Sequence, residues 1–129
     1  MSAYERIEQY RPFALALLRI VTALLFIEHG TQKLFNFPEA NFGDQMPTIF
    51  IVAGVIELIG GILVLLGLFT RPVAFILSGE MAFAYFLEHL PVSFFPAINE
   101  GDGAVLFCFI FLYLVFAGAG AWSLDGRRV

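Results

Sequence analysis

Residues 48–68 read TIFIVAGVIELIGGILVLLGL, an apolar run of 21 residues in which the only charged side chain is Glu57. A helix needs about 20 predominantly apolar residues to cross the hydrocarbon core of a bilayer. The run does not alternate between apolar and polar residues, as a membrane β-strand would. It therefore predicts a transmembrane helix.

Further apolar stretches flank this run, and they cover residues 12–35, 71–90 and 101–121. Pro12 suits the first turn of a helix, because the N–H that proline lacks would have no partner there. The link between the second and third stretches is very short, which predicts a tight antiparallel hairpin. We therefore expect an all-α integral membrane four-helix bundle, formed by residues 1–129 as a single domain.

The composition supports a membrane location for the whole chain. Hydrophobic residues make up 60% of the sequence and charged residues 14%, with a mean hydropathy of +0.86. A soluble domain of this length could not bury so much apolar surface. The basic residues form no cluster suited to nucleic acid. The single cysteine, Cys108, excludes an intrachain disulfide and a dithiol mechanism within the chain.

The distribution of basic residues predicts the orientation in the membrane, because such residues concentrate on the cytoplasmic side. One side of the predicted bundle is flanked by Arg6, Arg11, Arg71, Arg127 and Arg128. The other side has only Lys33 as a basic residue, and its loops carry Glu39, Asp44, Glu100 and Asp102. We therefore expect both termini to be cytoplasmic.

A weak internal repeat accompanies this layout. Residues 26–29 read FIEH and residues 86–89 read FLEH, at similar depths in two helices that run in the same direction. The match is consistent with duplication of a parallel two-helix unit. Chance in a chain with 16 phenylalanines is an equally good explanation.

Ionisable side chains inside the predicted spans are the main functional signal, since each costs at least about 2.5 kcal/mol in the membrane. Small neighbours such as Gly54 and Gly60 let another helix approach Glu57, which should therefore face a helix rather than lipid. At about 1.5 Å per residue, Glu57 and Glu80 both fall near the middle of the bilayer. Two carboxylates at one depth ionise together only at high cost. We expect either a retained proton or Arg19 between them.

We therefore predict a proton-handling centre made of Arg19, Glu57 and Glu80 as candidate catalytic residues. The candidate contacts for a quinone or another small molecule are these three together with His29, Lys33, Tyr85 and His89.

A purely structural role is the alternative for each of these residues. Arg19 and Lys33 can extend to the two membrane interfaces, and His29 and Glu57 can join helices by hydrogen bonds. On a regular helix His89 faces roughly opposite to Glu80. No metal is expected, because glutamate and histidine are adjacent here rather than spaced as Glu-x-x-His on one helix face. A haem bridged by His29 and His89 is geometrically possible, but none is expected, because His89 lies at the end of its helix and faces away from Glu80.

An ordered series of short motifs runs along nearly the whole chain. It comprises Leu18-Arg19, His29-Gly30-x-x-Lys33-Leu34-Phe35, Glu57-Leu58-x-Gly60-Gly61, Gly67-Leu68-Phe69-Thr70-Arg71, Glu80-Met81-Ala82-x-Ala84-Tyr85-Phe86, His89-Leu90-Pro91, Phe94-Phe95-Pro96, Asn99-Glu100-Gly101 and Gly120-x-Trp122-Ser123-Leu124-Asp125. In this order the motifs resemble the DoxX family of small bacterial membrane proteins.

The resemblance implies a four-helix protein of the bacterial inner membrane. Relatives include a subunit similar to that of a thiosulfate:quinone oxidoreductase and proteins of oxidative-stress complexes with peripheral enzymes. We therefore expect a membrane subunit of a quinone-linked redox or oxidative-stress complex, with electrons supplied by a partner. A non-catalytic anchor or assembly factor remains an alternative, as does a small-solute or proton carrier. The expected partners are the lipid bilayer, a peripheral redox enzyme or membrane protein, and further copies of the chain.

Overall fold

The computed structural model describes residues 1–40 and 46–127, and this part of the chain contains helices and no strands. The expectation of an all-helical chain is confirmed for these residues. Asp44 and Arg128, which contributed to the predicted orientation, lie outside the described residues.

The long helices begin close to the predicted positions but end earlier in two places. The helical segments are α1 (Ala3–Glu8), α2 (Arg11–Phe35), α3 (Thr48–Leu66), α4 (Thr70–Ala84), the π-helix η1 (Tyr85–His89), α5 (Pro96–Asn99), α6 (Asp102–Ala117) and the 3₁₀-helix η2 (Asp125–Arg127). α3 ends at Leu66 because Gly67 adopts a left-handed conformation, with φ of 67°. α6 ends before Gly118, whose φ is 81°. The predicted second and fourth spans thus include residues that have left the helix.

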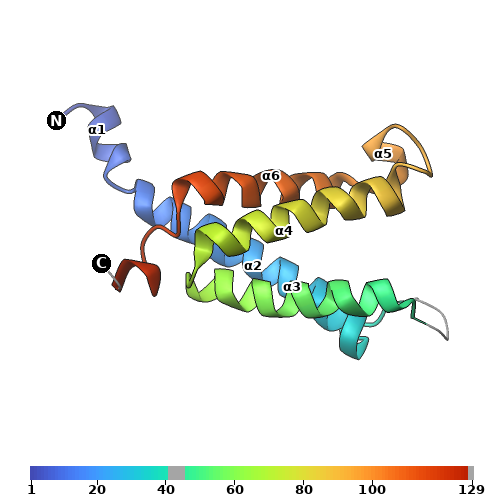
Figure 1. Cartoon of the computed structure of the whole chain (residues 1–129). Coiled ribbons are helices and arrows are strands. Elements are labelled where there is room, and N and C mark those ends of the chain that lie inside the picture. Colours follow the sequence, from blue (N-terminus) through green and yellow to red (C-terminus); the bar gives the residue numbers. More distant parts are fainter. Residues whose placement is uncertain (41–45, 128–129) are drawn as a thin grey trace.

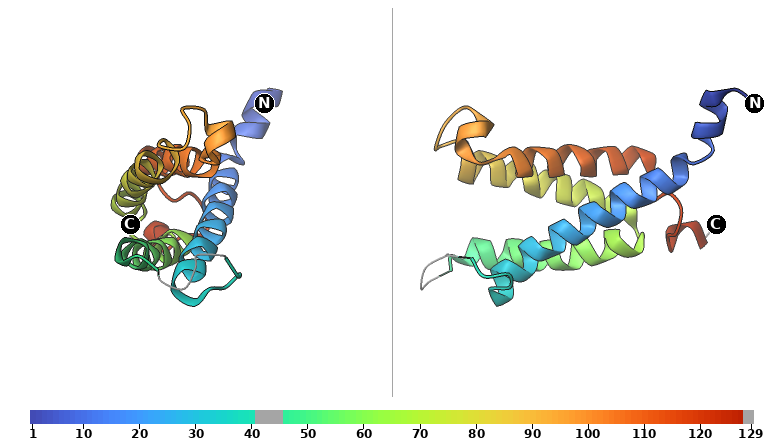
Figure 2. Two further views of the ribbon diagram at one scale, coloured as in Figure 1. Left: turned by 90° about the vertical axis from the view of Figure 1, so that its right-hand side faces the viewer. Right: turned by 180° about the vertical axis from the view of Figure 1, so that it is seen from behind.

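The long helices associate as two pairs, α2 with α3 and α4 with α6 (Figure 1). Both termini lie at one end of the molecule, and α5 lies at the opposite end. The two further views show that the pairs diverge toward the end that carries α5 (Figure 2). The short α3–α4 turn holds them together at the end with the termini.

The backbones of α2 and α3 almost touch where they cross. A Cβ atom added to Gly30 would lie 2.8 Å from the backbone nitrogen of Leu58 and 3.1 Å from the carbonyl oxygen of Gly54. Small residues at such a crossing allow the close approach that replaces hydrophobic driving force between helices in lipid. The small residues around Glu57 therefore do bring a second helix against α3.

We expect Gly30→Ala to destabilise the protein by about 1–3 kcal/mol, because the added methyl group meets backbone atoms that cannot move aside. Thermal unfolding in detergent micelles measures the change. Gly79→Ala is the matched control, since a Cβ at Gly79 meets nothing within 4 Å. The control should leave stability unchanged or raise it slightly. Equal effects of the two substitutions would contradict the close crossing.

The outer surface is apolar while several polar side chains are buried. Large hydrophobic side chains such as Leu24, Ile59 and Phe109 are each more than half exposed on the long helices. Arg19 and Glu57, by contrast, are 0% and 2% exposed. α2 and α3 are each long and apolar enough to cross a membrane, and α6 is apolar but shorter. An apolar exterior around buried charges suits contact with lipid rather than water.

An aromatic cluster fills the centre of the molecule between the two helix pairs. The ring of Phe26 on α2 packs edge-on against Phe107 and Phe111 of α6, with centroids 5.4 Å and 4.9 Å away. The Ser78 hydroxyl of α4 donates to the carbonyl oxygen of Cys108 of α6 at 2.8 Å. These contacts join α6 to α2 and to α4.

Candidate functional site

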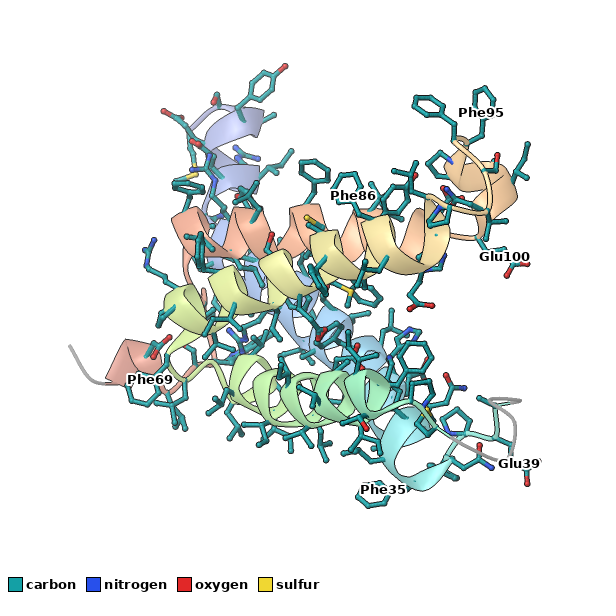
Figure 3. The ribbon with its side chains drawn as sticks, turned by 45° about the vertical axis from the view of Figure 1, so that its right-hand side comes forward. Phe35, Glu39, Phe69, Phe86, Phe95 and Glu100 are labelled. Atoms are coloured by element: carbon teal, nitrogen blue, oxygen red, sulfur yellow. The ribbon has the colours of Figure 1, made fainter. Side chains whose placement is uncertain are left out.

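A cavity of about 380 Å³ lies between the divergent ends of the two pairs. Its walls come from α2, α3, α4, η1 and α6, and the aromatic rings of Phe26 and Phe107 are among its lining residues. Glu100, labelled in Figure 3, lies at the end of the molecule that carries α5 and also lines the cavity. The other ionisable residues that line the cavity are His29, Lys33, Glu57, Glu80, Glu88 and His89.

An ion pair joins α2 to α3 on one wall of the cavity. The Lys33 ammonium donates to both carboxylate oxygens of Glu57, with Nζ···Oε1 of 3.0 Å and Nζ···Oε2 of 2.8 Å. The Glu57 side chain is 2% exposed and that of Lys33 is 19% exposed. Lys33 therefore turns inward to neutralise Glu57 instead of extending to the membrane interface.

Glu80 of α4 lies beside this pair, with its carboxyl group close to that of Glu57. Both of its carboxyl oxygens are buried, and neither has a hydrogen-bond partner within the described part of the chain. The charged groups of Glu57 and Lys33 act on it electrostatically. Burying a carboxyl group without hydrogen-bond donors costs folding free energy, so the position of Glu80 calls for an explanation.

His89 lines the same cavity because η1 changes the rotation of the helix that carries it. The backbone N–H of Leu90 donates to the carbonyl oxygen of Tyr85, five residues earlier, at 2.9 Å. A π-helix turns less per residue than an α-helix. The prediction that His89 faces away from Glu80 is therefore wrong, since it assumed a regular α-helix. π-Helical turns are often found at functional sites.

A hydrogen-bond network fixes the orientation of the His89 ring. Nδ1 of His89 lies 3.0 Å from the carbonyl oxygen of Asn99, which can only accept, so Nδ1 carries the proton. In the neutral ring Nε2 is then left as an acceptor. The buried Asn99 amide donates in turn to the Tyr85 hydroxyl at 3.1 Å and to the Ser93 carbonyl oxygen at 2.9 Å.

The remaining predicted contact residues have different surroundings. His29 lines the cavity, and its ring meets the ring of Phe107 edge-on at 5.7 Å. Tyr85 is not among the lining residues, and its hydroxyl accepts the bond from Asn99. Of the predicted contacts, the structure therefore gathers His29, Lys33, Glu57, Glu80 and His89 around one cavity.

Arg19 lies elsewhere, so the alternative in which it reaches between the two carboxyl groups is wrong. Its guanidinium group donates to the carbonyl oxygens of Ala119, Ala121 and Trp122, the last at 2.8 Å. The segment after α6 folds back over the end of the bundle that carries the termini, and this brings those carbonyl groups to Arg19. The cation beside Glu57 is Lys33 instead.

The same folded-back segment supplies a residue that the sequence did not single out for this role. The Asp125 carboxylate accepts from the backbone N–H groups of Phe69 and Thr70, at 2.8 Å and 3.0 Å. It thereby caps the first turn of α4, where N–H groups lack partners within the helix. No local pattern around residue 70 reveals a cap that comes from residue 125.

An apolar exterior, helices of membrane-spanning length and an inward-facing polar centre define a helical membrane protein. The DoxX family model matches residues 14–90, which is more than half of the chain. The chain therefore belongs to the DoxX family, as its sequence motifs predicted.

Relatives of similar length are known in several bacteria. An uncharacterized protein of Haemophilus influenzae is 52% identical, over 94% of this chain and 95% of its own. The inner membrane protein YphA of Escherichia coli is 31% identical, over 91% of each chain. The uncharacterized membrane protein Rv3486 of Mycobacterium tuberculosis is 29% identical, over 90% of this chain and 82% of its own. No solved structure gives a significant match.

Proposed function

We propose that the chain crosses the bacterial inner membrane four times, through α2, α3, α4 with η1, and α6, with both termini in the cytoplasm. Arg11 and Arg71 lie at the end of the bundle that carries the termini, whereas Glu39 and Glu100 lie at the other. This distribution agrees with the rule that basic residues stay on the cytoplasmic side. The cavity then opens toward the periplasmic half of the bilayer.

We propose further that this cavity is a binding site for the head group of a quinone, and that the chain is the membrane subunit of a redox complex. The buried Glu80 carboxyl without a partner, beside the Lys33–Glu57 ion pair, is the observation that carries this proposal. A flat ring with two polar edges fits a cavity that is lined by aromatic side chains and ionisable groups.

Each side chain has a distinct part in this proposal. Lys33 holds a third ammonium proton beyond the two bonded to Glu57, and this proton can be donated to a ligand oxygen. Glu80 and Nε2 of His89 can hold or accept protons at the cavity wall. A quinone supplies two-electron redox chemistry linked to protons, with electrons exchanged through a partner protein.

A binding measurement tests this function. A benzoquinone with a ten-carbon tail, titrated into the purified protein in lipid nanodiscs, should bind saturably. Ala53 lines the cavity, so Ala53→Leu should weaken binding at least tenfold by filling the space. Val52→Phe is the control, because Val52 is adjacent on α3, is 52% exposed and does not line the cavity. Non-saturable binding, or an equal effect of both variants, would refute the site.

A non-catalytic anchor is the second function that a specific contact favours, because the Lys33–Glu57 pair joins two helices directly. In that case Glu57→Gln should lower the yield of a complex with its partner protein without changing turnover per assembled complex. Loss of turnover in an intact complex would instead favour the quinone site.

A further inference from the structure

Buried polar atoms without partners discriminate between ligands more strongly than solvated ones, because water cannot take the place of a missing ligand group. Within the described part of the chain, such side-chain atoms belong to Arg19, Thr70 and Glu80. Of these residues only Glu80 lines the cavity. The unmet hydrogen-bonding capacity at the buried end of the site therefore resides in two carboxyl oxygens.

At least one of these oxygens requires a donor in either protonation state of the pair. An ionised Glu80 has acceptors only. If a proton is shared with the neighbouring Glu57, that proton is used between the two carboxyl groups and Glu80 still keeps an acceptor. Both oxygens of Glu57 already accept from Lys33, so Glu57 can supply at most that one shared proton.

His89 adds a second acceptor to the same cavity. Its Nδ1 proton is held by the carbonyl oxygen of Asn99, which leaves Nε2 of the neutral ring with a lone pair. The carboxylates of Glu88 and Glu100 lie among the lining residues as well. The acceptors of the lining thus outnumber the one remaining proton of Lys33 and the donors of His29 and Gln32.

The two forms of a quinone differ in this respect. The oxidised form presents two carbonyl oxygens, which only accept hydrogen bonds, whereas the reduced form presents two hydroxyl groups, which donate. We propose that the cavity binds the reduced, hydroxyl-bearing quinol in preference to the quinone, with Glu80 as the residue that selects it. This rests on the proposed quinone site and concerns binding alone, so no electron transfer is needed to observe it.

The test compares the affinities of the two redox forms for the same protein. The ten-carbon-tailed benzoquinone and its chemically reduced quinol are titrated under anaerobic conditions into the full-length protein in nanodiscs. We expect the quinol to bind about tenfold more tightly, the effect of one additional hydrogen bond to a buried carboxyl oxygen that otherwise has no donor. Glu80→Gln should reduce this ratio to about one or invert it, because the amide nitrogen donates to a carbonyl oxygen.

Glu28→Gln is the matched control, since Glu28 is an exposed carboxylate that does not line the cavity, and its ratio should stay that of the unaltered protein. The ratio is measured within each variant, so a partly unfolded sample lowers both signals equally. Equal affinities in the unaltered protein, or tighter binding of the quinone, would overturn the selectivity and leave the quinone site standing. An unchanged ratio in Glu80→Gln would remove Glu80 from that role. Failure of both forms to bind would remove the site itself.

Discussion

Replacing Arg19 with methionine is expected to destabilise the protein by about 3 kcal/mol or more, because buried carbonyl groups then lose their donors. Arg19 is 0% exposed and donates to the carbonyl oxygens of Ala119, Ala121 and Trp122. Methionine keeps an unbranched apolar stem and good helix propensity, so the change removes the donors with little other disturbance.

Hydrogen exchange shows which part of the chain is destabilised by Arg19→Met, and by how much. The backbone N–H groups of Ala121, Leu124 and Asp125 donate to residues 12, 66 and 67, at 3.0 Å, 3.1 Å and 2.8 Å. We expect Arg19→Met to speed exchange at these amides as the segment after α6 detaches. Arg11→Met is the control, because Arg11 is exposed and, among the described residues, forms an ion pair only with the exposed Glu8, a contact worth less than about 1 kcal/mol. If both variants unfold at the same temperature, Arg19 does not hold this segment.

The second large effect is expected for Lys33→Met, which should cost about 3–5 kcal/mol of stability. Glu57 is 2% exposed and accepts from Lys33 with both oxygens, so removal of the ammonium group leaves a buried carboxylate unpaired. Glu80, without a donor of its own in the described residues, then lies beside a second uncompensated carboxyl group. Thermal unfolding in detergent micelles measures the loss.

A double-mutant cycle separates the ion pair from the packing of the lysine stem. The combination of Lys33→Met with Glu57→Met removes both charges and should recover most of the lost stability, since an apolar pair can replace a buried ion pair without net loss. Additive losses in the double variant would show that the two charges are independently solvated.

Some features of this site could be predicted from the sequence because they depend on the spacing of nearby residues. The glycines around Glu57 predict that this residue faces another helix, and the charge-poor apolar runs predict helices in lipid. Lys33 and His29 share one face of α2 at a spacing of four residues, and both line the cavity. Such features follow from the regular period of an α-helix.

Other parts depend on departures from regularity or on contacts between distant residues. η1 moves His89 to the side of the cavity, and no residue type in the stretch from Tyr85 to His89 is specific for a π-helix. The partners of Arg19 lie about a hundred residues away in the sequence. Two of them, Ala119 and Ala121, fall within the predicted fourth span but beyond the observed end of α6 at Ala117. The spacing of residues along a helix predicts which face a side chain lies on, but it does not predict which distant residue that side chain contacts.

The most direct test of the account is to locate where a quinone binds on the protein. A quinone carrying a photoreactive azido group is irradiated with the protein in nanodiscs, and the modified residues are identified by mass spectrometry. We expect modification of the α3 segment that contains Ala53 and Glu57 and of the α4–η1 segment from Glu80 to His89, suppressed by excess unlabelled quinone. Modification spread over the outward faces of the helices, and unaffected by that excess, would contradict a ligand site between the two helix pairs.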